Sequence, residues 1–423
     1  MTQASFLPEE KPAPVTWTPT REAGQAQLDA FAPRAGGAYA RGRNFDLGPD
    51  NRDNVSALSP YVRRRLILEE EVVRAALARH EFHAAEKFIQ EVFWRGYFKG
   101  WLEHRPAVWS RYKERVVALA RDLDNDAALV CRYQEATEGK TGITCFDAWA
   151  SELVETGYLH NHARMWFASI WIFTLKLPWE LGADFFYRHL LDGDPASNTC
   201  SWRWVGGLHT QGKTYLARAD NIHKYTDGRF DPGGALAADA PPLNEPPLPA
   251  AAPPSFASDE IDAGRYGLII TDEDCAPETL ALARPPAAIL ALAAPTPVSV
   301  WPLSTRVSDF SSAAVNDAAT RAEAHFSVPC VHANSEGSGD RKKDEWSAAI
   351  ADFTAAHDLD AVVTARCPLG PVRKRLHMAV KKTDTRLIEI TRGYDRAVWP
   401  HAARGFFGLK KNIPAILSEI GLG

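Results

Sequence analysis

The sequence predicts an all-helical domain followed by a doubly wound parallel α/β domain, because its pattern changes twice along 423 residues. From about Ser59 to Phe230, apolar residues recur at spacings of three and four, the period of amphipathic helices. A run rich in Pro, Ala and Gly follows and predicts an extended linker. After Gly264, short β-type runs alternate with helical segments, as in parallel βαβ units.

We therefore expect four parts: an irregular leader over 1–38, a helical domain over 39–230, the linker over 231–263 and the α/β domain over 264–423. The clearest helical segments of the first domain are 61–78, 84–102, 146–156, 160–175 and 179–191. In the second, strands are expected at YGLIIT, AAILAL, VPCVHA, AVVTA and RLIEI, with helices over 345–357 and 372–382.

Composition indicates an ordinary globular chain. No stretch approaches the 18 consecutive apolar residues of a membrane span, and the N-terminus lacks the basic start and apolar core of a secretory signal. The six cysteines are scattered without a C-x-x-C pair, which favours free thiols in a reducing cytosol over a metal site. We expect a cytoplasmic monomer. A net charge of −5 does not indicate nucleic-acid binding, although a local basic rim could still hold a phosphate backbone.

Tryptophan is the unusual residue, since nine of the 13 lie between Trp94 and Trp204. One interpretation is a large helical core, which big aromatic side chains fill well. The other is a domain that stacks planar rings or passes electrons between them. The count alone leaves both open.

Two helical segments carry polar groups at the same spacing: Glu91, Trp94 and Arg95 in the first, and Asn161, Arg164 and Met165 in the second. Residues at i, i+3 and i+4 share one helix face. The first set could equally be a surface ion pair. The second lies in a strongly apolar helix, where a buried arginine needs an anionic partner or a cofactor.

Two further clusters could bind charged groups. Asp192 and Asp194 flank a glycine; they could cap a helix, pair with Arg164 or, with little other support, bind magnesium. Ser56 and Ser59 precede Pro60 at an expected helix start, which is either a plain N-cap or an anion site.

In their order and spacing, the segments EGKTG, DAW, TGYLHN-x-ARM, LP-W, LLDGDPASN and W-x-W resemble the FAD-binding domain of photolyases and cryptochromes. The resemblance covers about Tyr39 to Phe230 and implies a FAD folded into a U inside the helices. It implies that Ser56 to Ser59 hold the diphosphate, that Arg164 pairs with Asp192 beside the flavin ring, and that Asn198 faces the flavin N5. The implied cofactor-binding residues are Tyr39, Ser56, Ala57, Leu58, Ser59, Arg95, Arg164, Asp192, Asp194 (at the polar edge of the flavin) and Asn198.

The resemblance also implies a substrate, UV-damaged DNA. It places Glu91, Trp94, Asn161, Met165 and Trp204 around a flipped-out cyclobutane pyrimidine dimer, where a carboxyl and an amide can bond pyrimidine edges and indoles can pack against the rings. Enzymes acting on (6-4) photoproducts carry histidine at the position of Met165, which argues against that lesion. Reduced FAD would supply an electron under light and the dimer would split.

Several features depart from the family. Trp202 and Trp179 match the inner members of an electron chain, but no third member stands near Asp126, and Trp109, Tyr133 or Trp149 could substitute. Gly96 stands where relatives often have an acidic residue, and Ala136 where a tryptophan is usual. The α/β domain follows the FAD domain instead of preceding it. It could hold a second, antenna chromophore (a folate or a deazaflavin), or it could be empty.

Three functions follow from these patterns. The first is a light-driven DNA repair enzyme, which the lesion-cavity residues favour. The second is a cryptochrome-type photoreceptor without repair activity, which the altered domain order and the missing third electron carrier favour. The third is a DNA-binding flavoprotein that has lost its photochemistry.

Overall fold

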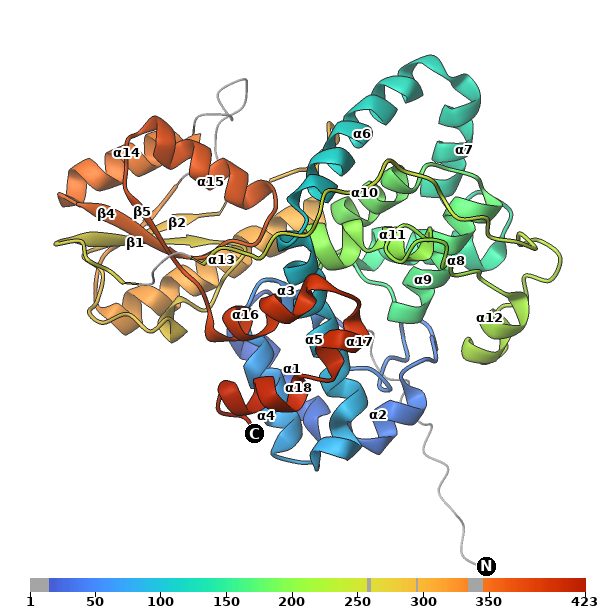
Figure 1. Ribbon diagram of the computed structural model, residues 1–423, viewed down its shortest axis with the longest axis horizontal. Helices are drawn as coiled ribbons and strands as arrows, with labels where there is room; N and C mark the ends of the chain where they lie inside the picture. The colour runs from blue at the N-terminus through green and yellow to red at the C-terminus, as the bar shows by residue number, and fades with distance from the viewer. Residues whose placement is uncertain (1–14, 257–259, 294–295, 334–344) are drawn as a thin grey trace, which may run out of the picture.

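The computed structural model describes residues 15–256, 260–293, 296–333 and 345–423. A helical unit and a parallel sheet unit lie side by side, and the C-terminal helices return to the helical unit (Figure 1). In the part of 231–263 that is described, the chain forms neither helix nor strand and runs along the helical unit, where the Leu243 amide donates to the Gly206 carbonyl.

The helical unit contains α1 (Arg21–Phe31), η1 (Ala32–Arg34), α2 (Gly37–Gly42), α3 (Ser59–Arg63), α4 (Glu69–Leu77), α5 (Phe82–Glu103), α6 (Pro106–Asn125), α7 (Ala127–Thr137), α8 (Thr144–Thr156), α9 (Asn161–Ser169), η2 (Ile170–Thr174), α10 (Trp179–His189), η3 (Pro195–Cys200), α11 (Trp202–Val205) and α12 (Ala219–Tyr225). The sheet unit contains β1 (Tyr266–Thr271), η4 (Pro277–Thr279), β2 (Ile289–Leu292), α13 (Thr305–Phe326), β3 (Cys330–His332), α14 (Glu345–His357), β4 (Ala361–Ala365), α15 (Pro371–Lys382) and β5 (Leu387–Ile390). The chain ends with α16 (Gly393–Val398), η6 (Trp399–Ala403), α17 (Phe406–Lys410) and α18 (Ile413–Glu419).

The prediction of an irregular leader over 1–38 is wrong for the residues that the structure describes there, because helices start at Arg21. The Thr20 side chain accepts a hydrogen bond from the Ala23 amide and caps α1. Leu28 and Phe31 are buried in the main core, so tertiary packing stabilises this helix. Residues 1–14 lie outside the described residues.

The sheet is parallel, in the order β3-β2-β1-β4-β5. Figure 1 shows α13 on one face and α14 and α15 on the other. Alternate residues of one strand face opposite layers: Leu268 belongs to the core shared with α13, whereas Ile269 packs with Trp346 of α14. Helices cover both faces, which confirms the predicted doubly wound α/β unit.

Arginines of the helical unit fill the carboxyl edge of this sheet. The helix predicted over 61–78 is interrupted after Arg63, and Arg65 has a φ of 51°. Arg63 binds Glu273 through two hydrogen bonds of 2.7 and 2.8 Å, and Arg64 donates to Asp272 at 2.6 Å. In open α/β sheets this edge commonly binds ligands. A folate or deazaflavin in this unit stays a prediction.

The C-terminal segment packs closely against α5 at two glycines, Gly96 and Gly100. A Cβ at Gly96 would lie 3.0 Å from the Tyr394 ring, and one at Gly100 would lie 2.9 Å from the Cα of Trp399. The two glycines are four residues apart and so share one helix face. The absence of a side chain at Gly96 thus makes room for a contact between α5 and α16.

We expect Gly100→Ala to lower the free energy of unfolding by about 1–3 kcal/mol, because the new methyl group must displace the backbone of η6. Denaturant unfolding of the full chain measures this. Gly408→Ala is the matched control, since a Cβ there meets nothing within 4 Å. Equal stability of the two variants would contradict close packing at Gly100.

Candidate functional site

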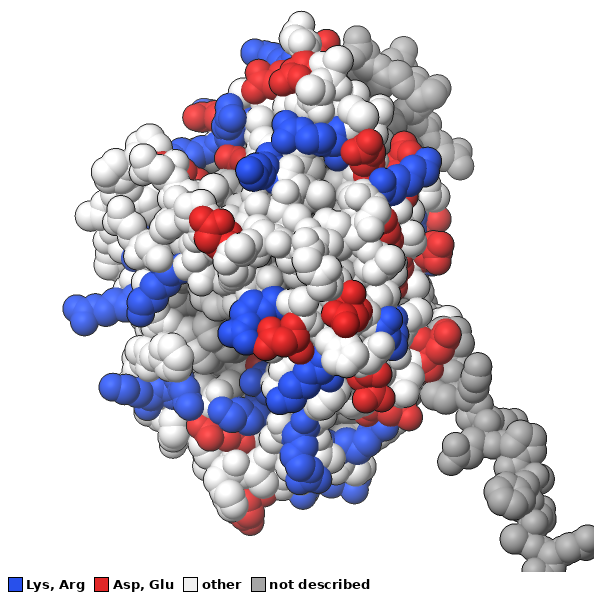
Figure 2. Space-filling model, turned by 90° about the vertical axis from the view of Figure 1, so that its right-hand side faces the viewer, with Lys and Arg blue, Asp and Glu red and all other residues white. Residues whose placement is uncertain are grey.

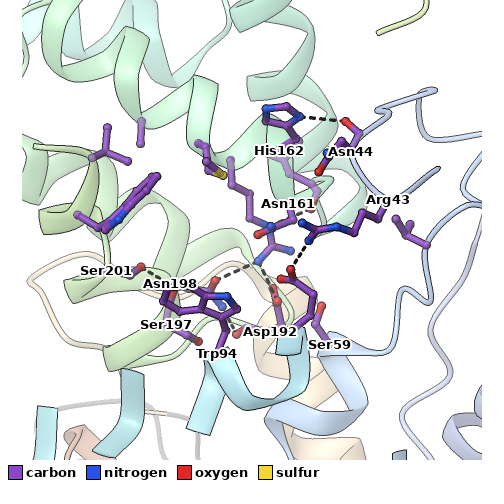
Figure 3. Close-up of a pocket in the computed structure, with 18 of the residues that line it drawn as sticks. Arg43, Asn44, Ser59, Trp94, Asn161, His162, Asp192, Ser197, Asn198 and Ser201 are labelled. Atoms are coloured by element: carbon purple, nitrogen blue, oxygen red, sulfur yellow. Dashed lines mark hydrogen bonds and ion pairs between the residues drawn. The ribbon is translucent and has the colours of Figure 1, made fainter. Parts of the chain in front are cut away.

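The helical unit contains a cavity of about 880 Å³ that is open to solvent, within the range of about 300–1,000 Å³ usual for ligand sites. Figure 3 shows its side chains converging from α5, α9, η3 and the chain before α3. The predicted site residues that line it are Tyr39, Ser56, Ala57, Leu58, Ser59, Glu91, Trp94, Arg95, Asn161, Arg164, Met165, Asp192, Asn198, Trp202 and Trp204. Asp194 and Trp179 do not line it.

Asp192 is the buried anion of the cavity. Its Oδ2 lies 2.8 Å from Arg164 and 3.4 Å from Arg95. Burial alone would raise the pKa of Asp192, but the ion pairs with Arg164 and Arg95 outweigh it and hold that pKa below its usual value. Its Oδ1 is buried and has no hydrogen-bond partner among the described residues. A buried carboxylate oxygen left open in this way fits a donor group on a bound ligand.

Asn198 is held at both ends of its amide. Its Nδ2 donates to the Asp192 carbonyl at 2.5 Å, and its Oδ1 accepts from Arg164 at 3.0 Å. Arg164 therefore fixes the orientation of the amide as well as the carboxylate beside it.

Asp194 lies below the cavity wall and caps η3. Its Oδ1 accepts from the amides of Ala196 and Ser197, and its Oδ2 accepts from Arg95 at 2.6 Å. These contacts use its acceptor oxygens within the protein, so contact of Asp194 with the polar edge of a flavin stays a prediction. In the described part of the chain, no three His, Cys, Asp or Glu side chains gather as metal ligands.

Glu91 forms an ion pair with Arg43, a residue that the sequence did not single out. Burial raises the pKa of the Glu91 carboxyl despite this guanidinium. Arg43 follows Tyr39 by four residues at the end of α2, so the i, i+4 spacing from a predicted site residue could have pointed to it.

Two further residues that line the cavity, Tyr215 and His162, were not singled out by the sequence. Trp204 stacks on Tyr215 with ring centroids 5.5 Å apart, and the Tyr215 hydroxyl lies 3.2 Å from Nε2 of His162. Nδ1 of His162 lies 3.0 Å from the Asn44 carbonyl (Figure 3). Nδ1 must donate to that carbonyl, and Nε2 accepts from the Tyr215 hydroxyl when the ring is neutral. Burial lowers the pKa of His162, in agreement with a neutral ring.

The segment before α3 presents its backbone to the cavity. Ala57 has a φ of 49°, a left-handed conformation that non-glycine residues rarely adopt. Leu58 follows in the right-handed region, and successive residues of opposite hand point their N–H groups into one concave surface. Trp17 donates to the Ala57 carbonyl at 2.8 Å and holds this turn. Such a surface suits the phosphates of a dinucleotide.

A series of aromatic rings connects Trp202 to the surface of the protein. It does not include Trp179, the predicted partner of Trp202 in an electron chain. The Trp202 ring meets Trp171 at 6.2 Å; Trp171 then meets Tyr133 at 6.1 Å, and Tyr133 stacks with Trp301 at 6.0 Å. Trp202, Trp171 and their neighbours are buried, whereas Tyr133 and Trp301 are partly exposed.

Trp179 belongs to a different aromatic group. Its ring lies 5.7 Å from Tyr112, which stacks with Trp109 at 5.4 Å. Among the ring contacts of the described residues, none joins Trp179 to Trp202. Trp149 packs on Trp166, away from both groups.

Comparison with known proteins bears on the part of the chain that supplies most of this cavity. Residues 88–239 match the family described as the FAD binding domain of DNA photolyase. The chain contains a photolyase-type FAD-binding domain. The open oxygen of Asp192 and the backbone turn at Ala57 fit FAD, because they offer an acceptor and phosphate-binding N–H groups within one cavity.

Relatives of this photolyase-type domain share part of their length with the chain. A deoxyribodipyrimidine photo-lyase of Thermus thermophilus is 34% identical over 210 residues, 50% of this chain and 48% of that protein. One of Streptomyces griseus is 33% identical over 183 residues, 40% of this chain and 38% of that protein. The match thus spans less than half the length of these curated relatives.

Two solved structures are similar in part. A bacterial class III photolyase from Agrobacterium tumefaciens has 29% identity and a TM-score of 0.42, covering 51% of this chain and 44% of that one. A cryptochrome from Synechocystis has 22% identity and a TM-score of 0.44, covering 53% and 46%. The likeness to photolyases lies in the helical unit of the chain. None of the described helices combines the length and apolar character needed to cross a bilayer.

Proposed function

We propose that the chain is a light-driven DNA repair flavoenzyme that splits cyclobutane pyrimidine dimers. One observation carries the proposal: Glu91, Trp94, Asn161, Met165 and Trp204 line the same cavity as Asp192 and Asn198. Residues suited to a pyrimidine dimer and residues suited to a flavin therefore share one space. Reduced FAD, when bound, supplies the electron that splits the dimer under light.

The residues of the chain bind and orient the substrate. Carboxyl and amide groups of Glu91 and Asn161 can hydrogen-bond the edges of a dimer that has left the base stack, and Trp94 and Trp204 offer flat apolar surfaces. Arg43 sets the position of Glu91 through their ion pair.

The outer surface supports DNA binding. Figure 2 shows the side of the molecule that carries α12, where Lys and Arg side chains gather beside a hollow, with acidic groups among them. Arg43 and Arg218 also line the cavity, where Arg43 is paired with Glu91 and Arg218 with Asp220. Positive charge at this place suits the phosphate backbone around a flipped-out lesion.

A cryptochrome-type photoreceptor is the second candidate. A photoreceptor needs electron supply to its flavin and no lesion. The ring path from Trp202 through Trp171 to Tyr133 and Trp301 offers such a supply, so the third carrier that the sequence left unassigned no longer separates the two candidates.

This path yields a prediction. Trp171→Phe is expected to slow light-driven reduction of the bound oxidised FAD more than Trp179→Phe does, because Trp171 contacts Trp202 and Trp179 contacts Tyr112 instead. Flavin absorbance during illumination with an external reductant measures both rates. A larger effect of Trp179→Phe would show that electrons pass through Trp179.

Illumination of the reduced protein with a thymine-dimer oligonucleotide tests the proposed function. Recovery of thymine absorbance in the light, with none in the dark, is the expected result. Normal photoreduction without recovery would reject repair and support the photoreceptor.

A further inference from the structure

An aromatic ring of the C-terminal segment stacks on Trp94. The Phe406 ring lies parallel to the indole of Trp94, with centroids 3.6 Å apart and planes 12° from parallel. Phe406 is only 4% exposed and does not line the cavity, whereas Trp94 does. Phe406 therefore supports the indole from outside the space that Trp94 borders.

The C-terminal segment approaches α5 closely at two glycines, Gly96 and Gly100. The C-terminal segment, residues 393–410, crosses Gly96 and Gly100, and Figure 1 shows its helices against α5. His104 at the end of α5 lies 3.0 Å from the Trp399 carbonyl, and Arg105 donates to the Ala403 carbonyl at 2.7 Å. These contacts fix the start of α17 beside Trp94.

Other neighbours leave the indole plane less constrained. Tyr97 meets Trp94 edge-on, at 5.5 Å and 86°, and Phe98 lies at 5.7 Å on the same helix. Both belong to α5, the helix that carries Trp94, and neither ring lies face to face with the indole at close range. Phe406 is the close parallel contact that comes from a different part of the chain.

We propose that the C-terminal segment completes the substrate side of the cavity, with Phe406 as a positioning residue that fixes the plane of Trp94 for contact with the pyrimidine dimer. The inference rests on the proposed function, because it assigns Trp94 to lesion binding. The segment that follows the sheet unit is then part of the substrate site, and the altered domain order has a functional consequence.

Binding of a thymine-dimer oligonucleotide and of its undamaged counterpart to the full, flavin-loaded chain tests this. Phe406→Ala is expected to reduce the preference for damaged DNA about 3- to 10-fold, the effect of losing one aromatic pair. Phe407→Ala, the adjacent substitution at a residue 76% exposed, is expected to leave the preference unchanged. Phe406→Tyr should restore it, because the flat ring is kept.

A double substitution separates positioning from general packing. With Trp94→Ala already present, Phe406→Ala should cause no further loss of preference. A loss of the same size in both backgrounds, or equal preference in Phe406→Ala and Phe407→Ala, would overturn the inference. Phe406→Leu, which keeps apolar volume without a flat ring, serves where Phe406→Ala does not fold. A native chain that binds both DNAs equally would instead reject the proposed function.

Discussion

Arg164→Leu is expected to purify almost free of FAD and to lose about 3 kcal/mol of unfolding free energy. Arg164 is the nearer cation of Asp192, a carboxylate with a 2% exposed side chain, and it also holds the Asn198 amide. Removing it leaves a buried charge with only Arg95, 3.4 Å away, as compensation. The ratio of flavin to protein absorbance and a denaturant titration measure the two effects.

Arg132→Leu is the matched control for this variant. Arg132 lies on α7 with an exposed side chain, outside the cavity, so its loss should leave flavin content and stability unchanged. A normal flavin ratio in Arg164→Leu would mean that Arg164 and Asp192 do not hold the cofactor together.

Glu91→Ala is expected to weaken binding of dimer-containing DNA about 10- to 100-fold while FAD stays bound. The variant removes a carboxyl that can bond the pyrimidine edge and also releases Arg43 from its ion pair. Asp192, Arg164 and Asn198 do not depend on Glu91 for their hydrogen bonds. Titration of labelled oligonucleotide and flavin absorbance of the same sample measure both properties.

Glu86→Ala provides the comparison, because it makes the same change on the same helix outside the cavity. It should bind dimer-containing DNA like the native chain. Should Glu91→Ala also bind the lesion normally, the lesion would have to lie elsewhere than against α5.

Local pattern predicted much of this fold. The helix expected over 345–357 has those bounds in α14, and the strands YGLIIT and AVVTA match β1 and β4, because periodicity and strand length are local signals. The helix expected over 61–78 is broken, because Arg63 and Arg64 bind acids more than 200 residues later. The described part of the predicted leader is helical because Leu28 and Phe31 pack into the main hydrophobic core with residues distant in the sequence. No local pattern reports such partners.

For the candidate site too, the sequence indicated some residues and not others. Motifs with fixed spacing, such as the set around Arg164, indicated residues that do line one cavity. Tyr215, His162 and Phe406 carry no spacing signal, since each acts through a partner brought near by the fold. Trp171 lies in a strongly apolar segment, so the sequence does not distinguish it from an ordinary core residue. In the structure its ring contacts Trp202.

The central claim is that one cavity in the helical unit holds one FAD between Asp192 and the turn at Ala57. Titration of FAD into the flavin-stripped full chain, followed by flavin fluorescence, tests it most directly. The predicted result is saturation at one FAD per chain, with affinity sharply reduced in Arg164→Leu and unchanged in Arg132→Leu. Absence of saturable binding, or equal affinity in all three proteins, would contradict the account.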